Sequence, residues 1–83
     1  MNLSIIIPVF NELENIDLLN KKLTDVLEPM NIDYEVIWVN DGSDDGSAEK
    51  LNLVAEANKR MKVIHFRKNF GQTAAIMAGI KFS

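Results

Sequence analysis

Residues 39–47, with the sequence VNDGSDDGS, place three carboxylates and two glycines directly behind an apolar run. Carboxylates this close together can ligate a cation, accept hydrogen bonds from a sugar or a nucleoside, or favour a turn. An EF-hand calcium loop starting at Asp41 would need a bidentate Glu at its last position, which holds Asn52. A strand pattern rather than a helix also precedes the loop. A turn and a ligand-binding site therefore remain.

A strand-to-helix turn explains part of this segment. Each of the two Asp-Gly pairs tolerates a positive φ, and Ser43, Asp44 or Asp45 can cap a following helix. A turn does not require Asp41, which comes immediately after the apolar run. From that position a carboxylate points into the crevice above a parallel sheet, where it can accept a hydrogen bond from a ribose or from a base N–H.

Three short apolar, β-branched runs predict the strands that position these residues: Leu3–Val9, residues 34–39 and residues 62–66. Helical spacing of apolar residues predicts three intervening or following helices. In the first, Asn11 and Glu14 are expected to form a capping box, and Pro29 to end the helix. Its apolar positions are Ile16, Leu19, Leu23, Val26 and Leu27. The second runs to about Lys59, and the third covers residues 72–82.

Strands that alternate with helices imply an α/β fold with a parallel sheet and right-handed crossovers. Two crossovers of the same hand give the spatial strand order 3-2-1. The loops at the carboxyl ends of the strands, residues 8–14, 40–47 and 67–72, then meet at one edge of the sheet. They are also the most polar junctions in the chain, which predicts a site there.

The composition excludes several other classes. The chain has 83 residues and a net charge of −3, which suits one globular domain and argues against a general nucleic-acid binder. It has no cysteine, so it has neither a disulfide nor a thiolate zinc site. The N-terminal stretch lacks the basic segment of a secretory signal, and no run approaches the roughly 20 apolar residues that span a bilayer.

Two nucleotide folds also fit poorly. A Rossmann dinucleotide site needs glycines after the first strand, and residues 8–14 contain none. A phosphate receiver needs a second acid pair near the aspartate that ends a central strand. Plain structural roles stay open for several polar residues: helix-start support for Glu12 and Glu14, solvation for Arg67 and Lys68, and a local partner for His65. The Ala and Gly face of the third helix predicts close packing on the sheet.

Three segments in register resemble the start of family 2 glycosyltransferases with the GT-A fold: residues 4–12 (SIIIPVFNE), 39–47, and 67–79 (RKNFGQTAAIMAG). The third segment is most similar to the polyprenyl-phosphate branch, which includes dolichol-phosphate mannose synthases and bacterial undecaprenyl-phosphate sugar transferases. The resemblance covers nearly the whole chain. It implies a Rossmann-like βαβαβα half of a GT-A fold, the nucleotide-sugar-binding part.

The resemblance also implies roles for individual residues. The loop after the first strand lines the nucleotide pocket, Asp41 holds the nucleoside, and the loop after the third strand closes over the nucleotide. Arg67 or Lys68 would offset diphosphate charge. Asn40 replaces an aspartate that many members carry, so no metal role is assigned to it. The implied nucleotide-sugar-binding residues are Pro8, Phe10, Glu12, Asp41, Arg67, Asn69 and Gly71.

For a full-length enzyme, the resemblance implies transfer of a sugar from a UDP- or GDP-linked donor to a polyprenyl phosphate, with Mg²⁺ or Mn²⁺, at the cytoplasmic membrane face. Its catalytic groups and Asp-x-Asp metal motif are expected beyond Ser83. The 83-residue chain is therefore predicted to transfer no sugar alone, and to self-associate through its first strand or exposed apolar surface. A stand-alone binding module without catalysis, or a structural fragment that binds nothing, remain as alternatives.

Overall fold

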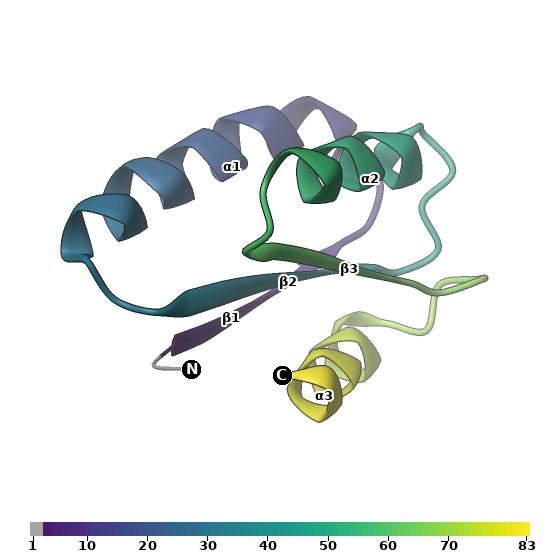
Figure 1. The fold of residues 1–83 in the computed structure, drawn as a ribbon. Coiled ribbons are helices and arrows are strands. Elements are labelled where there is room, and N and C mark those ends of the chain that lie inside the picture. The colour runs from purple at the N-terminus through teal and green to yellow at the C-terminus, as the bar shows by residue number, and fades with distance from the viewer. Residues whose placement is uncertain (1–2) are drawn as a thin grey trace.

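The computed structural model describes residues 3–83 as alternating strands and helices (Figure 1). Residues 1–2 lie outside this range. They belong to the N-terminal stretch that is predicted not to be a secretory signal. The elements in chain order are β1 (Leu3–Val9), α1 (Leu13–Leu27), a 3-10 turn η1 (Glu28–Met30), β2 (Tyr34–Asn40), α2 (Ser47–Ala57), β3 (Met61–His65) and α3 (Gln72–Phe82).

The three strands are parallel, and β2 lies between β1 and β3, which confirms the predicted order 3-2-1. In the register of the sheet, Val9 lies beside Asn40, and Asn40 beside His65. All three strands therefore stop at the same level. The loops that follow them are brought to one edge, as the sequence predicts.

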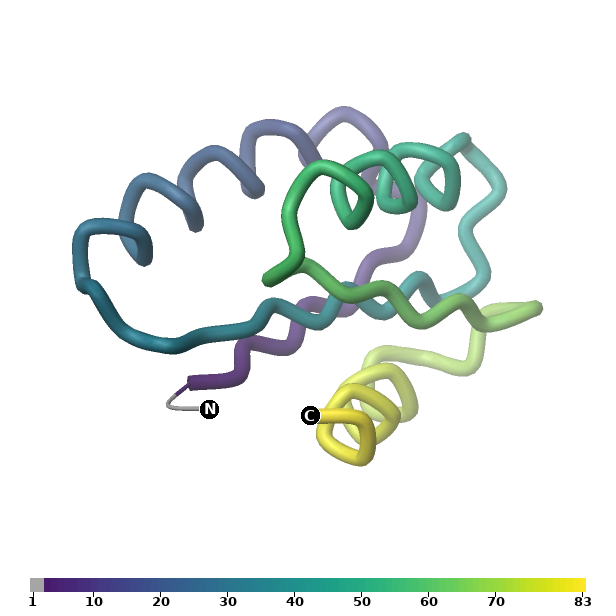
Figure 2. Tube along the Cα trace, in the orientation of Figure 1, coloured from purple at the N-terminus to yellow at the C-terminus, as the bar shows by residue number. Residues whose placement is uncertain are grey.

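Helices cover both faces of the sheet, α1 and α2 on one and α3 on the other (Figures 1 and 2). Tyr34, Val36 and Trp38 of β2 pack under α1 and α2, while Ile37 and Val39 face Ala75 of α3. Every residue of β2 is buried, which explains its nearly continuous apolar sequence. Gly79 lets α3 approach β1, because a Cβ there would lie 2.4 Å from Cγ2 of Ile6. The small-residue face is therefore close packing, as predicted.

The predicted start of α1 is wrong. The helix begins at Leu13, Glu12 occupies the N-cap position without a side-chain cap, and Asn11 has φ 52°. Asn11 cannot form a capping box with Glu14 because its side chain bonds the acidic turn instead. Val26, also expected on the core side, is 64% exposed, since α1 buries the narrower stripe through Ile16 and Leu27.

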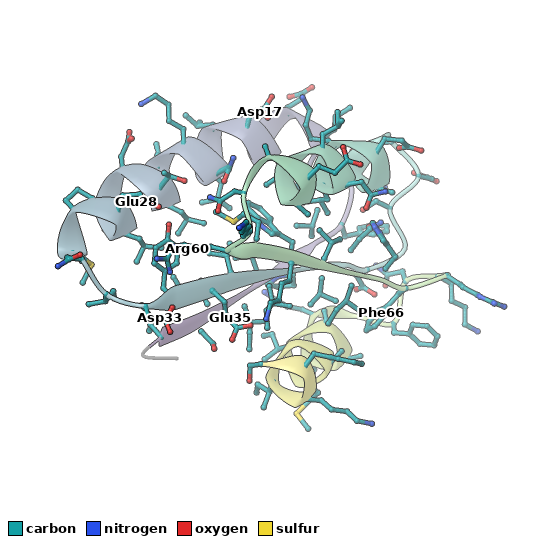
Figure 3. All side chains as sticks on the ribbon, viewed as in Figure 1. Asp17, Glu28, Asp33, Glu35, Arg60 and Phe66 are labelled. Atoms are coloured by element: carbon teal, nitrogen blue, oxygen red, sulfur yellow. The ribbon has the colours of Figure 1, made fainter. Side chains whose placement is uncertain are left out.

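Polar side chains at the amino end of the sheet pair with one another (Figure 3). The Arg60 guanidinium lies 4.4 Å from the centroid of the Tyr34 ring and 3.4 Å from Oδ1 of Asp33. The Tyr34 hydroxyl donates to Glu28 Oε1 over 2.8 Å. Burial, and then this hydrogen bond, raise the pKa of Tyr34. This cluster holds η1 and the start of β3 against β2.

Within residues 3–83, no helix combines the length and the apolar character needed to cross a bilayer.

Candidate functional site: the loops at the carboxyl edge of the sheet

Asp41 fixes the loop that follows β3. Its side chain is buried, and its two carboxylate oxygens accept main-chain N–H groups of Phe70 and Gly71, over 2.8 and 2.9 Å. The Asn69 side-chain amide also donates to the Asp41 carbonyl. The carboxylate therefore holds residues 69–71 over the end of β2.

Gly42 allows that loop to cross the end of β2. It has φ 74°, and a Cβ at this position would lie 2.3 Å from the Lys68 carbonyl carbon and 2.4 Å from the Asn69 nitrogen. Both contacts are with main-chain atoms, which cannot move aside as a flexible side chain can. Glycine is thus required at residue 42 for its conformation and for space.

The other side of the acidic turn fixes the loop that follows β1. Asn11 donates its N–H to Ser43 Oγ and accepts the Asp44 N–H on its side-chain oxygen, each over 2.9 Å. Asp45 Oδ2 accepts the Leu13 N–H over 3.2 Å. Residues 43–45 thereby hold residues 11–13, although more than 30 positions separate them in the chain.

Asn40 and His65 connect the turn to α2. Asn40 is buried; its Oδ1 accepts the Ser43 N–H, and its Nδ2 lies 3.1 Å from His65 Nδ1. His65 Nε2 lies 2.8 Å from Asn52 Oδ1 on α2. The predicted local partner of His65 is therefore present.

These loops enclose an open pocket of about 450 Å³, which lies in the usual range for small-molecule sites. Its lining comes from the loop between β1 and α1, the end of β2, and the loop between β3 and α3. The first and last of these loops lead to helices on opposite faces of the sheet (Figure 1). The lining residues are Pro8, Val9, Phe10, Glu12, Asp41, Asn69, Gly71 and Gln72.

The pocket gathers six of the seven residues singled out in the sequence: Pro8, Phe10, Glu12, Asp41, Asn69 and Gly71. Arg67 follows β3 at the same edge of the sheet, but it is exposed and does not line the pocket. The sequence reasoning missed Val9 and Gln72. Gln72 is the first residue of a helix behind a glycine, and the rule that anions bind at helix N-termini points to it.

The pocket combines acidic side chains with the start of a helix. Glu12 supplies a carboxylate from the loop after β1, while Gly71 and Gln72 form the start of α3, where the Asp41 carboxylate already accepts the Gly71 N–H. The N–H groups of the first turn of α3 that follow Gly71, together with the helix dipole, favour an anion at this helix start. Gly71 has φ 97° and ψ 160°, a conformation that is essentially restricted to glycine.

A family model described as glycosyl transferase family 2 matches residues 4–83. The chain belongs to this family. An uncharacterized glycosyltransferase of Synechocystis sp. is 40% identical over 83 residues, which are 100% of this chain and 26% of that protein. An undecaprenyl-phosphate 4-deoxy-4-formamido-L-arabinose transferase of Pseudomonas fluorescens is 40% identical over 79 residues, 94% of this chain and 23% of that protein. This chain thus spans about a quarter of the length of these relatives.

Among solved structures, a mannosyltransferase of Pyrobaculum calidifontis in complex with GDP-Man and Mn²⁺ superposes with a TM-score of 0.76. The alignment has 21% identity and covers 98% of this chain and 24% of the other. The likeness concerns the fold. It confirms the predicted fold class, a Rossmann-like α/β half of a GT-A domain.

The acidic residues of the turn at residues 41–45 do not form a metal site. The Asp45 carboxylate bonds Leu13 and Ser47, and the Ser47 hydroxyl above all lowers the pKa of Asp45 below its usual range. The Asp41 oxygens bond main-chain N–H groups. Among residues 3–83, no three acidic or histidine side chains are grouped so that they could hold a cation.

Proposed function

We propose that residues 3–83 form the nucleotide-sugar-binding part of a glycosyltransferase. The observation that supports this most is the pocket itself, which brings together polar loops from all three strands at the point where successive helices leave for opposite faces. Ligands of open α/β sheets bind at such points. The proposed binding residues are Pro8, Phe10, Glu12, Asp41, Arg67, Asn69 and Gly71.

The polar groups of the pocket suggest how a nucleotide would lie. Glu12 and Asp41 can accept hydrogen bonds from a base or a ribose, and the exposed Phe10 ring offers a surface on which a base can stack. The start of α3 would receive the diphosphate. Arg67 and Lys68, which are exposed just outside the pocket, would add positive charge there.

In this proposal Asp41 holds the loop after β3 and also accepts a hydrogen bond from the nucleotide. Each of its oxygens already accepts one N–H group, and a carboxylate oxygen has a further lone pair. A base N–H can therefore be accepted in addition to the bonds with Phe70 and Gly71.

For the whole protein we propose transfer of a sugar from a UDP- or GDP-linked donor to a polyprenyl phosphate. The Pseudomonas fluorescens relative, described as an undecaprenyl-phosphate sugar transferase, supports this acceptor class. An acceptor of that kind resides in a membrane, so the proposed location is its cytoplasmic face.

The proposed donor chemistry includes a divalent cation, Mg²⁺ or Mn²⁺, which stabilises a departing diphosphate. The Pyrobaculum calidifontis mannosyltransferase is described with Mn²⁺ and GDP-Man. The acids of residues 3–83 do not fit as its ligands, because no three acidic or histidine side chains among them are grouped around one point. We therefore assign the cation to carboxylates outside these residues, and expect no sugar transfer by the 83-residue chain alone.

Titration of the chain with GDP-mannose and UDP-glucose, with and without Mn²⁺, tests the pocket. Phe10→Ala should weaken binding about tenfold, because it removes a pocket side chain that is 46% exposed and contributes little to the core. Phe82→Ala, at a 64% exposed phenylalanine on α3 outside the pocket, is the matched control and should leave the affinity unchanged. Equal affinities of wild type and Phe10→Ala would place the nucleotide elsewhere.

Self-association is a separate proposal. β1 is an edge of the three-stranded sheet, and α3 exposes Ile76, Met77 and Ile80. Edge strands and apolar patches favour association. Light scattering at increasing concentration should show a mass above 9.4 kDa, and a monomer throughout would contradict it.

A further inference from the structure

Asp44 and Asp45 are adjacent carboxylates with different surroundings. The Asp45 side chain is half-buried and accepts three hydrogen bonds. Asp44 is exposed, and among the interactions found for residues 3–83 it contributes only its main-chain N–H, to Asn11. The chain therefore contains a matched pair in which one carboxylate is engaged and its neighbour is not.

Asp45 supplies the cap that two helices lack. Neither Glu12, at the N-cap of α1, nor Gly46, at the N-cap of α2, makes a side-chain cap hydrogen bond. Asp45 Oδ2 accepts the Leu13 N–H of α1 over 3.2 Å. Its Oδ1 accepts the N–H and the hydroxyl of Ser47 at the start of α2, over 3.1 and 2.5 Å. A negative charge also interacts favourably with both helix N-termini.

The hydrogen bond between Asp45 and the Leu13 N–H of α1 lies next to the pocket. Leu13 directly follows Glu12, which lines the pocket, and Phe10 lies at the other end of the same short loop. Asn11, between them, is held by Ser43 and by the Asp44 main chain. Asp45 itself is not among the lining residues. Its influence on a ligand would therefore pass through the position of residues 10–13.

We infer that Asp45 is a positioning residue that sets the geometry of the Phe10–Glu12 wall by joining the N-termini of α1 and α2. This inference rests on the proposed function for its effect on nucleotide affinity. Its structural part, the hold on residues 10–13, can be measured without any nucleotide.

The test compares Asp45→Asn with Asp44→Asn in the full 83-residue chain. An asparagine side chain has one acceptor oxygen, so it cannot serve Leu13 and Ser47 as the two carboxylate oxygens do. In Asp45→Asn, hydrogen exchange at the Leu13 amide should accelerate about tenfold, and the amide resonances of Phe10 and Glu12 should shift. Affinity for GDP-mannose or UDP-glucose should fall about tenfold. Asp44→Asn should change none of these three quantities.

Ser47→Ala separates positioning from general stability. This variant removes the hydroxyl bond on the α2 side of Asp45 and keeps the bond to Leu13, so it should lower stability with little loss of affinity. Two results would overturn the inference: unchanged Phe10–Leu13 resonances in Asp45→Asn, or an affinity loss in Ser47→Ala that matches the loss in Asp45→Asn. If wild type binds neither nucleotide sugar, the proposed function fails, and the exchange and resonance data still decide the hold on the loop.

Discussion

The two ends of β2 use buried acids in different ways. At the amino end, Glu35 accepts hydrogen bonds from the Lys62 ammonium and the Ser4 hydroxyl, over 3.1 and 3.0 Å. At the carboxyl end, Asp41 accepts main-chain N–H groups of the loop after β3. Both side chains are buried. The first acid is satisfied by side chains of neighbouring strands, and the second determines the path of the chain.

This difference predicts different consequences of mutation. A side-chain pair with one exposed partner contributes little stability, and Lys62 is 53% exposed. A hydrogen bond to a charged group contributes about 1.5–3 kcal/mol, and Asp41 accepts two of them from part-buried main-chain N–H groups. Changes at the carboxyl end should therefore alter both stability and the shape of the pocket, whereas changes at the amino end should alter stability alone.

The largest effect is expected from Asp41→Ala. It leaves the Phe70 and Gly71 N–H groups without acceptors and should lower the free energy of unfolding by about 2–4 kcal/mol. Urea denaturation measures the loss, and titration should find no nucleotide binding. Asp44→Ala, on the exposed neighbour, is the control and should stay within about 0.5 kcal/mol of wild type. Retained affinity in Asp41→Ala would mean that the nucleotide binds outside the proposed pocket.

Gly42→Ala tests whether the close approach of the loop matters beyond the acid. The new Cβ would overlap main-chain atoms of Lys68 and Asn69, at a positive φ, and should cost about 2–3 kcal/mol. Gly46→Ala is the matched comparison, because it also has a positive φ but its Cβ would meet only a Leu13 side-chain atom at 3.4 Å. It should cost about 1 kcal/mol. Similar thermal unfolding of the two variants would contradict a steric requirement at Gly42.

At the amino end, Tyr34→Phe should have a smaller effect. It removes the hydroxyl that donates to Glu28 while keeping the buried ring beneath Arg60, and should cost about 1 kcal/mol. Nucleotide affinity should not change, because Tyr34 lies at the opposite end of β2 from the pocket. Weaker binding in Tyr34→Phe would mean that the two ends are coupled.

The smallest effect is a change in pH dependence. The Lys62 hydrogen bond lowers the pKa of Glu35, so the folded state holds this proton less tightly than the unfolded state. The stabilisation from Glu35 is complete above the pKa of this residue in the unfolded chain, about 4.3. It is lost as the pH falls through the lower pKa of the folded state. Urea denaturation between pH 7 and pH 3 should show a shallower loss for Glu35→Gln than for wild type. Parallel curves would remove Glu35 from the acid response.

The fold was largely predictable because its signals are local. Apolar β-branched runs and helical spacing determine the elements, and the handedness of crossovers determines the strand order. The boundaries of β1 and α3 were predicted as observed, and β2 continues only one residue further, to Asn40. The α1 start was missed because its cap comes from Asp45, far away in the sequence. A local rule cannot detect an acceptor that arrives only after folding.

The residues that line the site could be predicted better than the hydrogen bonds that they make. Spacing brought Pro8, Asp41 and Gly71 to one edge, since each lies at or beside the carboxyl end of a strand or the start of a helix. The sequence did not indicate that the Asp41 carboxylate would bond the Phe70 and Gly71 amides. Nor did it show that Arg67 would lie outside the pocket, because side-chain direction in an irregular loop has no periodicity.

Pro8 has a consequence for the free side of β1. Leu3 donates its N–H to Asp33, and the Val9 carbonyl accepts from Asp41, so Ser4, Ile6 and Pro8 direct their main-chain groups outward. A strand added on this side would find N–H donors at Ser4 and Ile6 only, because proline has none. The hydrogen-bond ladder would therefore lack a donor at Pro8, the last outward-facing position before Phe10. Donation from β1 to an added strand thus ends at Ile6, before the chain reaches the pocket residue Phe10.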